Sequence, residues 1–120
     1  MSQISKSDLF KRQITLSEIG EAGQQKLQEA KILVVGCGGL GSPISVYLAS
    51  SGIGKLHLID FDTVDISNLH RQVFYSLKDI GKFKSECLSN FIQQRAPFTE
   101  VSFSKEAITK ENAIELISEY

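Results

Sequence analysis

The sequence predicts an α/β protein on a Rossmann-like (doubly wound) parallel sheet, of which it supplies the first half. An apolar, β-branched run at residues 32–35 leads at once into a glycine-rich turn, an apolar helical segment and a second apolar run. That second run ends at Asp60, 19 residues after Gly41, the last glycine of the turn. A further helix and strand then follow, which gives about three strands and four helices.

Composition fits a single domain without special partners. The chain has 120 residues, of which 42% are hydrophobic, and its formal net charge is −1. Mixed charges predict no nucleic-acid or membrane partner, and the apolar runs are too short to span a bilayer. The N-terminus lacks a signal core, so we expect a cytoplasmic protein with reduced Cys37 and Cys87. No metal site is predicted, and His57 and His70 are interpreted as non-catalytic.

Residues 1–30 are predicted to form an arm and a first helix. The arm is polar, and Arg12 and Gln13 are interpreted from composition alone as solvated residues on it. A helix is expected over residues 17–30, weakened in its front half by Gly20 and Gly23. The apolar anchors of the arm are Leu9, Phe10, Ile14 and Leu16.

Residues 31–72 are predicted to form a βαβ unit. The first strand, Ile32–Val35, reads as a buried parallel strand because its apolar run is continuous. Ser42 is expected to cap the connecting helix, with Pro43 in its first turn and Gly52 at its end. The inner face of this helix is expected to consist of Ile44, Tyr47, Leu48 and Ser51.

The turn between the first strand and the helix carries Gly36, Gly38, Gly39 and Gly41. Glycines let the backbone bend sharply and let a phosphate approach the main chain, where free N–H groups at a helix start favour an anion. The second strand, Lys55–Ile59, brings Asp60 to the position where an acid accepts hydrogen bonds from a ribose. The pattern predicts a nucleotide site and leaves open whether the nucleotide is ATP or NAD.

A polar segment follows Asp60 and ends with Asn68, Arg71 and Gln72. Its apolar spacing fits neither a helix nor a strand, so we expect an ordered loop with a short helical turn around residues 67–72. Polar residues this dense beside a nucleotide-binding edge are typical of a functional site.

Residues 73–120 are predicted to add a helix over 81–95, a short strand at Val101 and Phe103, and a final helix from Thr109. Lys84 begins the first of these helices and is either solvated or directed at a bound phosphate. A strand order of 3-2-1-4 leaves one edge of the first strand bare, so the chain is expected to be the first half of a larger domain. The apolar stripe of the 81–95 helix is Phe83, Cys87, Leu88, Phe91 and Ile92.

Three stretches, VVGCGGLGSP, YLASSGIGKLHLIDFDTVDISNLHRQ and GKFK, resemble the ThiF/MoeB/HesA enzymes of the ubiquitin-like-protein activating superfamily. The likeness runs from about Leu9 to Tyr120, and the NLxRQ signature is more specific than the glycine motif. The resemblance implies a Rossmann-like domain that uses ATP to adenylate the C-terminal glycine of a ubiquitin-like sulfur-carrier protein, in thiamine or molybdopterin synthesis.

The resemblance also implies roles for single residues. Arg71 and Lys84 match catalytic cations that grip the triphosphate, and Arg12 matches a cation that the partner subunit of a homodimer contributes. A family aspartate that binds Mg²⁺ follows a fourth strand, which this chain lacks, and Phe83 replaces the usual proline. The implied ATP-binding set is Gly36, Gly38, Gly39, Gly41, Asp60, Asp62, Asn68, Arg71, Gln72 and Lys84.

Two alternatives stay open. The glycine motif and Asp60 suit NAD as well as ATP, which would indicate half of an NAD-dependent oxidoreductase domain. The 120-residue chain is also expected to lack independent turnover, as a non-catalytic fragment or as one half of a split enzyme that works only when complemented.

Overall fold

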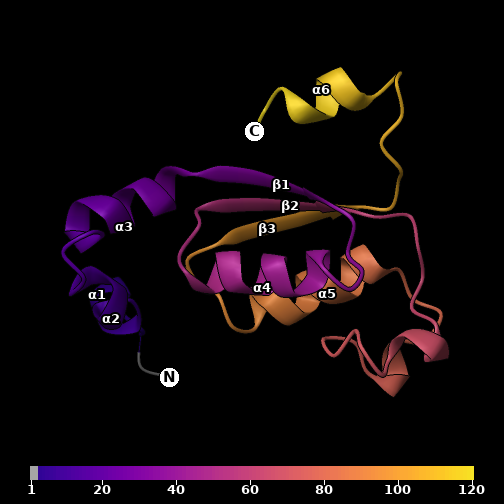
Figure 1. Ribbon diagram of the computed structural model, residues 1–120, viewed down its shortest axis with the longest axis horizontal. Coiled ribbons are helices and arrows are strands. Elements are labelled where there is room, and N and C mark those ends of the chain that lie inside the picture. The colour runs from indigo at the N-terminus through magenta and orange to yellow at the C-terminus, as the bar shows by residue number, and fades with distance from the viewer. Residues whose placement is uncertain (1–2) are drawn as a thin grey trace.

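Three parallel strands form the centre of the computed structural model, which describes residues 3–120. The strands lie in the order β1-β2-β3 (Figure 1) and pair in register, with Val35 opposite Ile59 and Ile59 opposite Ser104. Their carboxyl ends therefore meet at one edge of the sheet. The predicted parallel sheet is confirmed, with bounds β1 (Lys31–Val35), β2 (Lys55–Ile59) and β3 (Glu100–Ser104).

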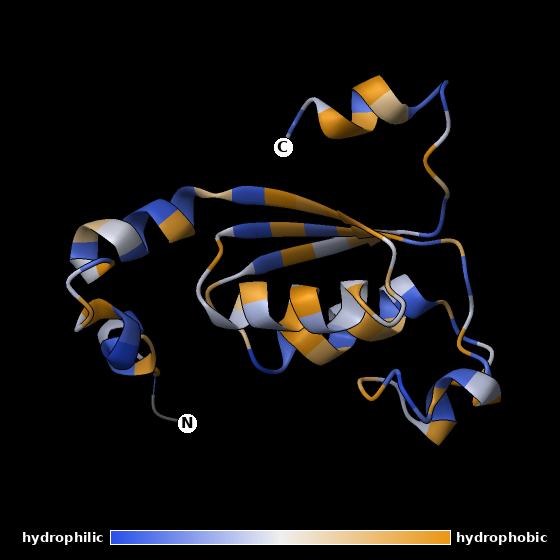
Figure 2. Cartoon of the chain, viewed as in Figure 1, coloured by the Kyte–Doolittle hydropathy of each residue, from blue (hydrophilic) through white to orange (hydrophobic). Residues whose placement is uncertain are grey.

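Helices α4 (Gly41–Ser50) and α5 (Lys84–Gln93) cover one face of this sheet (Figure 1). Because side chains alternate along a strand, Leu56 and Leu58 both point towards these helices and are fully buried. His57 points to the other face, where its ring hydrogen-bonds the hydroxyls of two β3 serines. Figure 2 shows apolar residues along β1, β2, α4 and α5, and also on α6.

The side of α4 that faces the core differs from the prediction. Ile44 and Tyr47 are 50% and 74% exposed, so they lie outside the core. The helix instead buries its small side chains because it packs against both β1 and α5. Ser42 lies within the helix rather than at its cap, and its hydroxyl donates to the Gly38 carbonyl at 2.6 Å. The buried face consists of Ser42, Ser45, Val46 and Ala49.

The N-terminal arm is helical rather than extended; its residues 1 and 2 lie outside the described range. It forms α1 (Lys6–Leu9) and α2 (Lys11–Ile14), and the predicted first helix is α3 (Gly20–Glu29). This helix begins later than expected because Gly20 takes a left-handed φ of +59°, which breaks the helical path. Among the four predicted anchors only Phe10 is buried, at 3% exposure.

The remaining elements follow the predicted order with shorter bounds. The polar loop holds two 3₁₀ turns, η1 (Ile66–Asn68) and η2 (Leu77–Asp79), so its expected helical turn is confirmed slightly earlier in the chain. The stripe of α5 is confirmed, with Cys87, Leu88 and Ile92 all buried. The last helix, α6, is reduced to Ala113–Ile117. Within residues 3–120, each helix is too short or too polar to cross a membrane.

Candidate functional site

The glycine loop, residues 36–41, joins β1 to α4 at the carboxyl edge of the sheet (Figure 1). Gly36 has a φ of +101°, which side chains rarely adopt. A Cβ on Gly41 would lie 1.8 Å from the Gly36 carbonyl oxygen, so the loop closes only with glycine there. A Cβ on Gly39, by contrast, would meet no atom within 4 Å. The loop is thus fixed at its ends and open at its middle.

The open part of the loop offers hydrogen-bond donors. Within residues 3–120, no acceptor is found for the backbone N–H groups of Gly38 and Gly39. They lie next to the N-terminus of α4, where the helix dipole adds positive potential. Unpaired donors at such a position are the usual protein contribution to binding a phosphate.

Asp60 anchors this loop to the end of β2. One carboxylate oxygen accepts the Cys37 N–H at 2.7 Å, and the other accepts the Asp62 N–H at 2.8 Å. Each carboxylate oxygen has a second lone pair, so Asp60 keeps acceptor capacity for the hydroxyls of a ribose. Sequence reasoning predicted a ligand-binding acid here and missed that the same side chain also holds the loop.

Lys84 is buried rather than solvated. Its side chain is 6% exposed, and its ammonium lies 3.6 Å from an Asp62 carboxylate oxygen. Burial, helped by the charge of Asp60 and opposed by that of Lys84, raises the pKa of the Cys37 thiol to about 12. The solvated alternative for Lys84 is therefore wrong, and its direction towards a phosphate stays a prediction.

A short antiparallel bridge holds Lys84 in place. It pairs Thr63 with Phe83, next to the first turn of α5. The Lys84 N–H donates to the Asp62 carbonyl at 3.0 Å, and the Val64 N–H donates to the Lys82 carbonyl at 2.8 Å. These bonds join segments that are distant in sequence and fix the main chain of Lys84 at the start of α5, next to Asp62.

Two other predicted site residues of the polar loop, Asn68 and Arg71, form hydrogen bonds within that loop rather than with the glycine loop. Asn68 accepts the Asp65 N–H at 3.1 Å and so caps its own 3₁₀ turn. The Arg71 guanidinium is exposed and donates to the Ser67 carbonyl at 3.3 Å. In the described part of the chain, no hydrogen bond or ion pair joins Arg71 to Lys84 or to the glycine loop. Lys84 is thus buried beside Asp62, whereas Arg71 is exposed and bonded to its own loop, and their predicted contact with a triphosphate stays a prediction.

Gln72 lies behind the glycine loop. It is 4% exposed, and its amide nitrogen would lie 3.7 Å from a Cβ on Gly38. Its side-chain oxygen is buried and has no hydrogen-bond partner among residues 3–120. Gln72 thus borders the predicted site from the protein side.

Arg12 belongs to α2, which lies at the opposite end of the sheet from the glycine loop (Figure 1). The neighbouring Gln13 donates to the Ser51 carbonyl at 2.9 Å, at the C-terminal end of α4. A helix with the length of α4 spans about 15 Å, and the glycine loop lies at its other end. Within residues 3–120, the exposed side chain of Arg12 makes no hydrogen bond or ion pair. Gln13 is half-buried, so its interpretation as solvated is wrong.

Two cavities adjoin these elements. The smaller, about 260 Å³, borders Gly36 and Asp60 and is walled by Val35, Ile59, Phe61 and residues 106–108. Sequence reasoning missed residues 106–108, whose position depends on the path of the chain after β3. An apolar slot beside a carboxylate is suited to a nucleoside.

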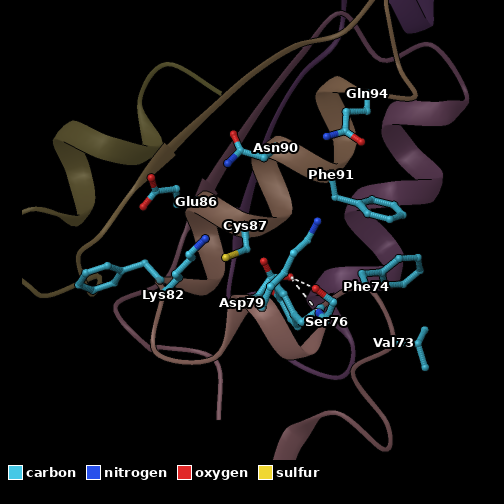
Figure 3. Close-up of a pocket in the computed structure, with 13 residues that line it drawn as sticks. Val73, Phe74, Ser76, Asp79, Lys82, Glu86, Cys87, Asn90, Phe91 and Gln94 are labelled. Carbon is cyan, nitrogen blue, oxygen red and sulfur yellow. Dashed lines mark hydrogen bonds between the residues drawn. The ribbon is translucent and has the colours of Figure 1, made fainter. Parts of the chain in front are cut away.

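The larger cavity, about 700 Å³, lies between the 73–83 loop and α5 (Figure 3). Its walls carry two lysines and two acids, Lys78, Lys82, Asp79 and Glu86, so its charge favours neither sign. Burial raises the pKa of Cys87 on its wall to about 11, which keeps the thiol protonated and unreactive at neutral pH. We therefore place the candidate site at the glycine loop, where donors, cation and carboxylate converge.

Comparison with known proteins identifies the family of the chain. The chain matches the ThiF family over residues 10–120. It is 41% identical over 111 residues to the adenylyltransferase and sulfurtransferase MOCS3 of Culex quinquefasciatus, covering 92% of this chain and 25% of that protein. It is 38% identical over 113 residues to the sulfur carrier protein adenylyltransferase of Thermus thermophilus, covering 94% of this chain and 42% of that protein. The chain thus spans less than half the length of these curated relatives.

The fold agrees with these sequence matches. E. coli tRNA N6-threonylcarbamoyladenosine dehydratase, TcdA, solved in complex with ATP, superposes with a TM-score of 0.87 and 33% identity. The match covers 98% of this chain and 48% of TcdA. A family match over nearly the whole length and a shared fold together show that the chain belongs to the ThiF family.

Proposed function

We propose that this chain binds ATP at its glycine loop and is the ATP-binding part of an adenylyltransferase. One observation carries the proposal: unpaired loop N–H groups lie at the same sheet edge as the buried ammonium of Lys84. The named activity of the MOCS3 and Thermus relatives, and ATP in the TcdA structure, support it. As its substrate we propose the C-terminal glycine of a ubiquitin-like sulfur-carrier protein, in thiamine or molybdopterin synthesis.

Each part of ATP has a proposed partner. The phosphates bind the free N–H groups of Gly38 and Gly39, and the ribose hydroxyls donate to Asp60. The base occupies the 260 Å³ cavity beside Asp60. The Lys84 ammonium lies 3.6 Å from an Asp62 carboxylate oxygen, which is a long distance for an ion pair. In the proposal, a phosphate oxygen binds the ammonium in place of this carboxylate or together with it.

The proposed reaction is a nucleotidyl transfer without redox chemistry. A carboxylate oxygen of the carrier attacks the α-phosphorus, and the bond from that phosphorus to the β-phosphate oxygen breaks. Pyrophosphate leaves with the electron pair, and the carrier becomes an acyl adenylate. Such transfers need positioned reactants and cations that neutralise the developing negative charge. We assign that role to Lys84, to Arg71 once it leaves the Ser67 carbonyl, and to Arg12 of the partner subunit in a homodimer.

Magnesium has no proposed ligand in this chain. Among residues 3–120, no group of three or more His, Cys, Asp or Glu side chains converges to hold a metal ion. The proposal therefore routes no step through Mg²⁺, which accompanies the ATP phosphates.

Equilibrium titration with ATP and with NAD tests the proposal. A hydrogen bond between charged groups contributes on the order of 1.5–3 kcal/mol, so Lys84→Ala is expected to weaken ATP binding about tenfold or more. Lys82→Ala removes an exposed lysine two residues away and is the matched control, expected to bind as wild type. Equal binding of NAD and ATP by wild type, or unchanged ATP binding by Lys84→Ala, would overturn the assignment.

A further inference from the structure

The backbone at Cys37 is held from two sides. Its N–H donates to the Asp60 carboxylate at 2.7 Å, and its carbonyl accepts a hydrogen bond from the Tyr75 hydroxyl. Cys37 is 0% exposed and Tyr75 is 5% exposed, so water does not compete for the bond between them. The loop is thereby fixed at the residue directly before its unpaired N–H groups.

The Tyr75 bond sets the direction of one of those N–H groups. The Cys37 carbonyl and the Gly38 N–H belong to one planar trans peptide unit, in which they point in opposite directions. A hydroxyl that fixes the carbonyl therefore also fixes the N–H, which points away from Tyr75. Gly38 has no side chain that would limit rotation of this peptide, so its orientation depends on the hydrogen bond.

From this geometry we propose that Tyr75 is a positioning residue that orients the Gly38 N–H towards the phosphates of the bound nucleotide. Tyr75 acts through the Cys37 peptide and does not itself touch the nucleotide. Its ring borders the larger cavity, on the side of the 73–83 loop, and only its hydroxyl reaches the glycine loop. The inference rests on the proposed ATP site.

The substitution Tyr75→Phe isolates the hydroxyl, because the ring and its packing remain. Tyr47→Phe makes the same chemical change on the outer side of α4, where Tyr47 is 74% exposed, and is the matched control. We would measure dissociation constants for ATP and for adenosine, which shares the base and ribose of ATP and lacks its phosphates. Tyr75→Phe is expected to weaken ATP binding about fivefold to tenfold and to leave adenosine binding unchanged. Tyr47→Phe is expected to change neither.

A spectroscopic readout separates orientation from general loosening of the fold. In ¹H–¹⁵N spectra, the Gly38 amide resonance is expected to move strongly when ATP is added to wild type and to Tyr47→Phe, and much less in Tyr75→Phe. Equal ATP affinity in wild type and Tyr75→Phe would overturn the inference, and so would an equal loss of ATP and adenosine affinity. Failure of the wild type to bind ATP would overturn the proposed function itself, and this inference with it, before any variant is compared.

Discussion

At the scale of single residues, glycine is needed for different reasons at the end and in the middle of the loop: for folding at Gly41 and for ligand binding at Gly39. Gly41 is needed for closure, because a Cβ there would overlap the Gly36 carbonyl. Gly39 has open space around its Cβ position and no positive φ, so the fold itself tolerates a side chain there. If the open space receives phosphate, a methyl group at position 39 harms binding without harming folding.

The expected outcome is a contrast between two alanine variants. Gly39→Ala should change the free energy of unfolding by less than about 1 kcal/mol and should weaken ATP binding strongly, because its methyl group occupies the phosphate space. Gly41→Ala should lose on the order of 2 kcal/mol or more of stability through backbone overlap. Denaturant unfolding and ATP titration of both variants measure this. Wild-type ATP affinity in Gly39→Ala would contradict the placement of the phosphates.

The buried thiol of Cys37 predicts a pH dependence of stability. Its pKa is raised by burial from 9.0 to about 12, so between these values the unfolded chain loses the thiol proton and the folded chain keeps it. The thiol's contribution is complete below pH 9 and is lost as the pH rises towards 12, by up to about 1.4 kcal/mol per pH unit.

Comparison with Cys37→Ala isolates that contribution from other groups that titrate at high pH. The free energy of unfolding should fall more steeply with pH in wild type than in the variant, measured by denaturant unfolding between pH 8 and pH 10.5. Parallel pH profiles for the two proteins would show that the thiol titrates normally in the folded state.

At the scale of elements, local sequence patterns predicted the strands and the α5 stripe well. The second strand matches its predicted bounds, and the first differs by one residue, because continuous apolar runs between turn residues predict parallel strands. The prediction that the first strand is buried is wrong: β1 lies at the edge of the sheet, and Val35 is 59% exposed. The inner face of α4 was predicted wrongly, since periodicity favours the largest apolar residues and does not reveal how closely a helix approaches its neighbours. Here Ser45 is buried and Tyr47 is exposed.

The parts of the site that the sequence did not reveal depend on contacts between distant segments. Lys84 is buried next to the bridge between Thr63 and Phe83, a pairing of segments 20 residues apart that no local pattern encodes. The hydrogen bond from Tyr75 to Cys37 joins residues 38 positions apart. The glycine loop and Asp60 were predictable because the sequence pattern that marks them lies within one continuous βαβ unit.

In the bridge between Thr63 and Phe83, the backbone of Phe83 is compatible with proline, so we expect the fold to tolerate Phe83→Pro. Phe83 has a φ of −67°, which proline adopts, and in the described chain its N–H makes no hydrogen bond. Phe83→Pro should stay within about 1 kcal/mol of wild-type stability and keep its ATP affinity. Lys82→Pro removes an N–H that donates to the Asp79 carbonyl at 2.9 Å and should be clearly less stable. Equal destabilisation of both variants in thermal unfolding would show that Phe83 contributes more than its backbone.

At the scale of the whole molecule, the position of Arg12 predicts a shared site. Arg12 lies at the far end of α4 from its own glycine loop, so any role at the nucleotide requires a second copy of the chain. In a mixture of Arg12→Ala and Lys84→Ala chains, half of the sites in each mixed dimer would combine an intact Lys84 with an intact Arg12 of the partner subunit. ATP binding by the mixture should exceed the average of the two variants measured alone. Binding equal to that average would place Arg12 outside the site.

Because the curated relatives are much longer than this chain, the 120 residues alone are not expected to complete the adenylation reaction. The chain spans 25% of the MOCS3 relative and 42% of the Thermus relative, so we expect carrier-dependent pyrophosphate exchange only when a complementary polypeptide is present. Exchange assays with the chain alone and with an added polypeptide that carries the remaining sequence of the Thermus relative measure this. Robust exchange by residues 1–120 alone would contradict this expectation and leave the ATP site intact.

The central claim is that ATP phosphates bind the N–H groups of the glycine loop, and an ATP titration followed residue by residue in ¹H–¹⁵N spectra tests it most directly. The account predicts that the amides of Gly38 and Gly39 move most, together with those around Asp60 and Lys84. Shifts confined to the larger cavity between the 73–83 loop and α5, with an unmoved glycine loop, would contradict it.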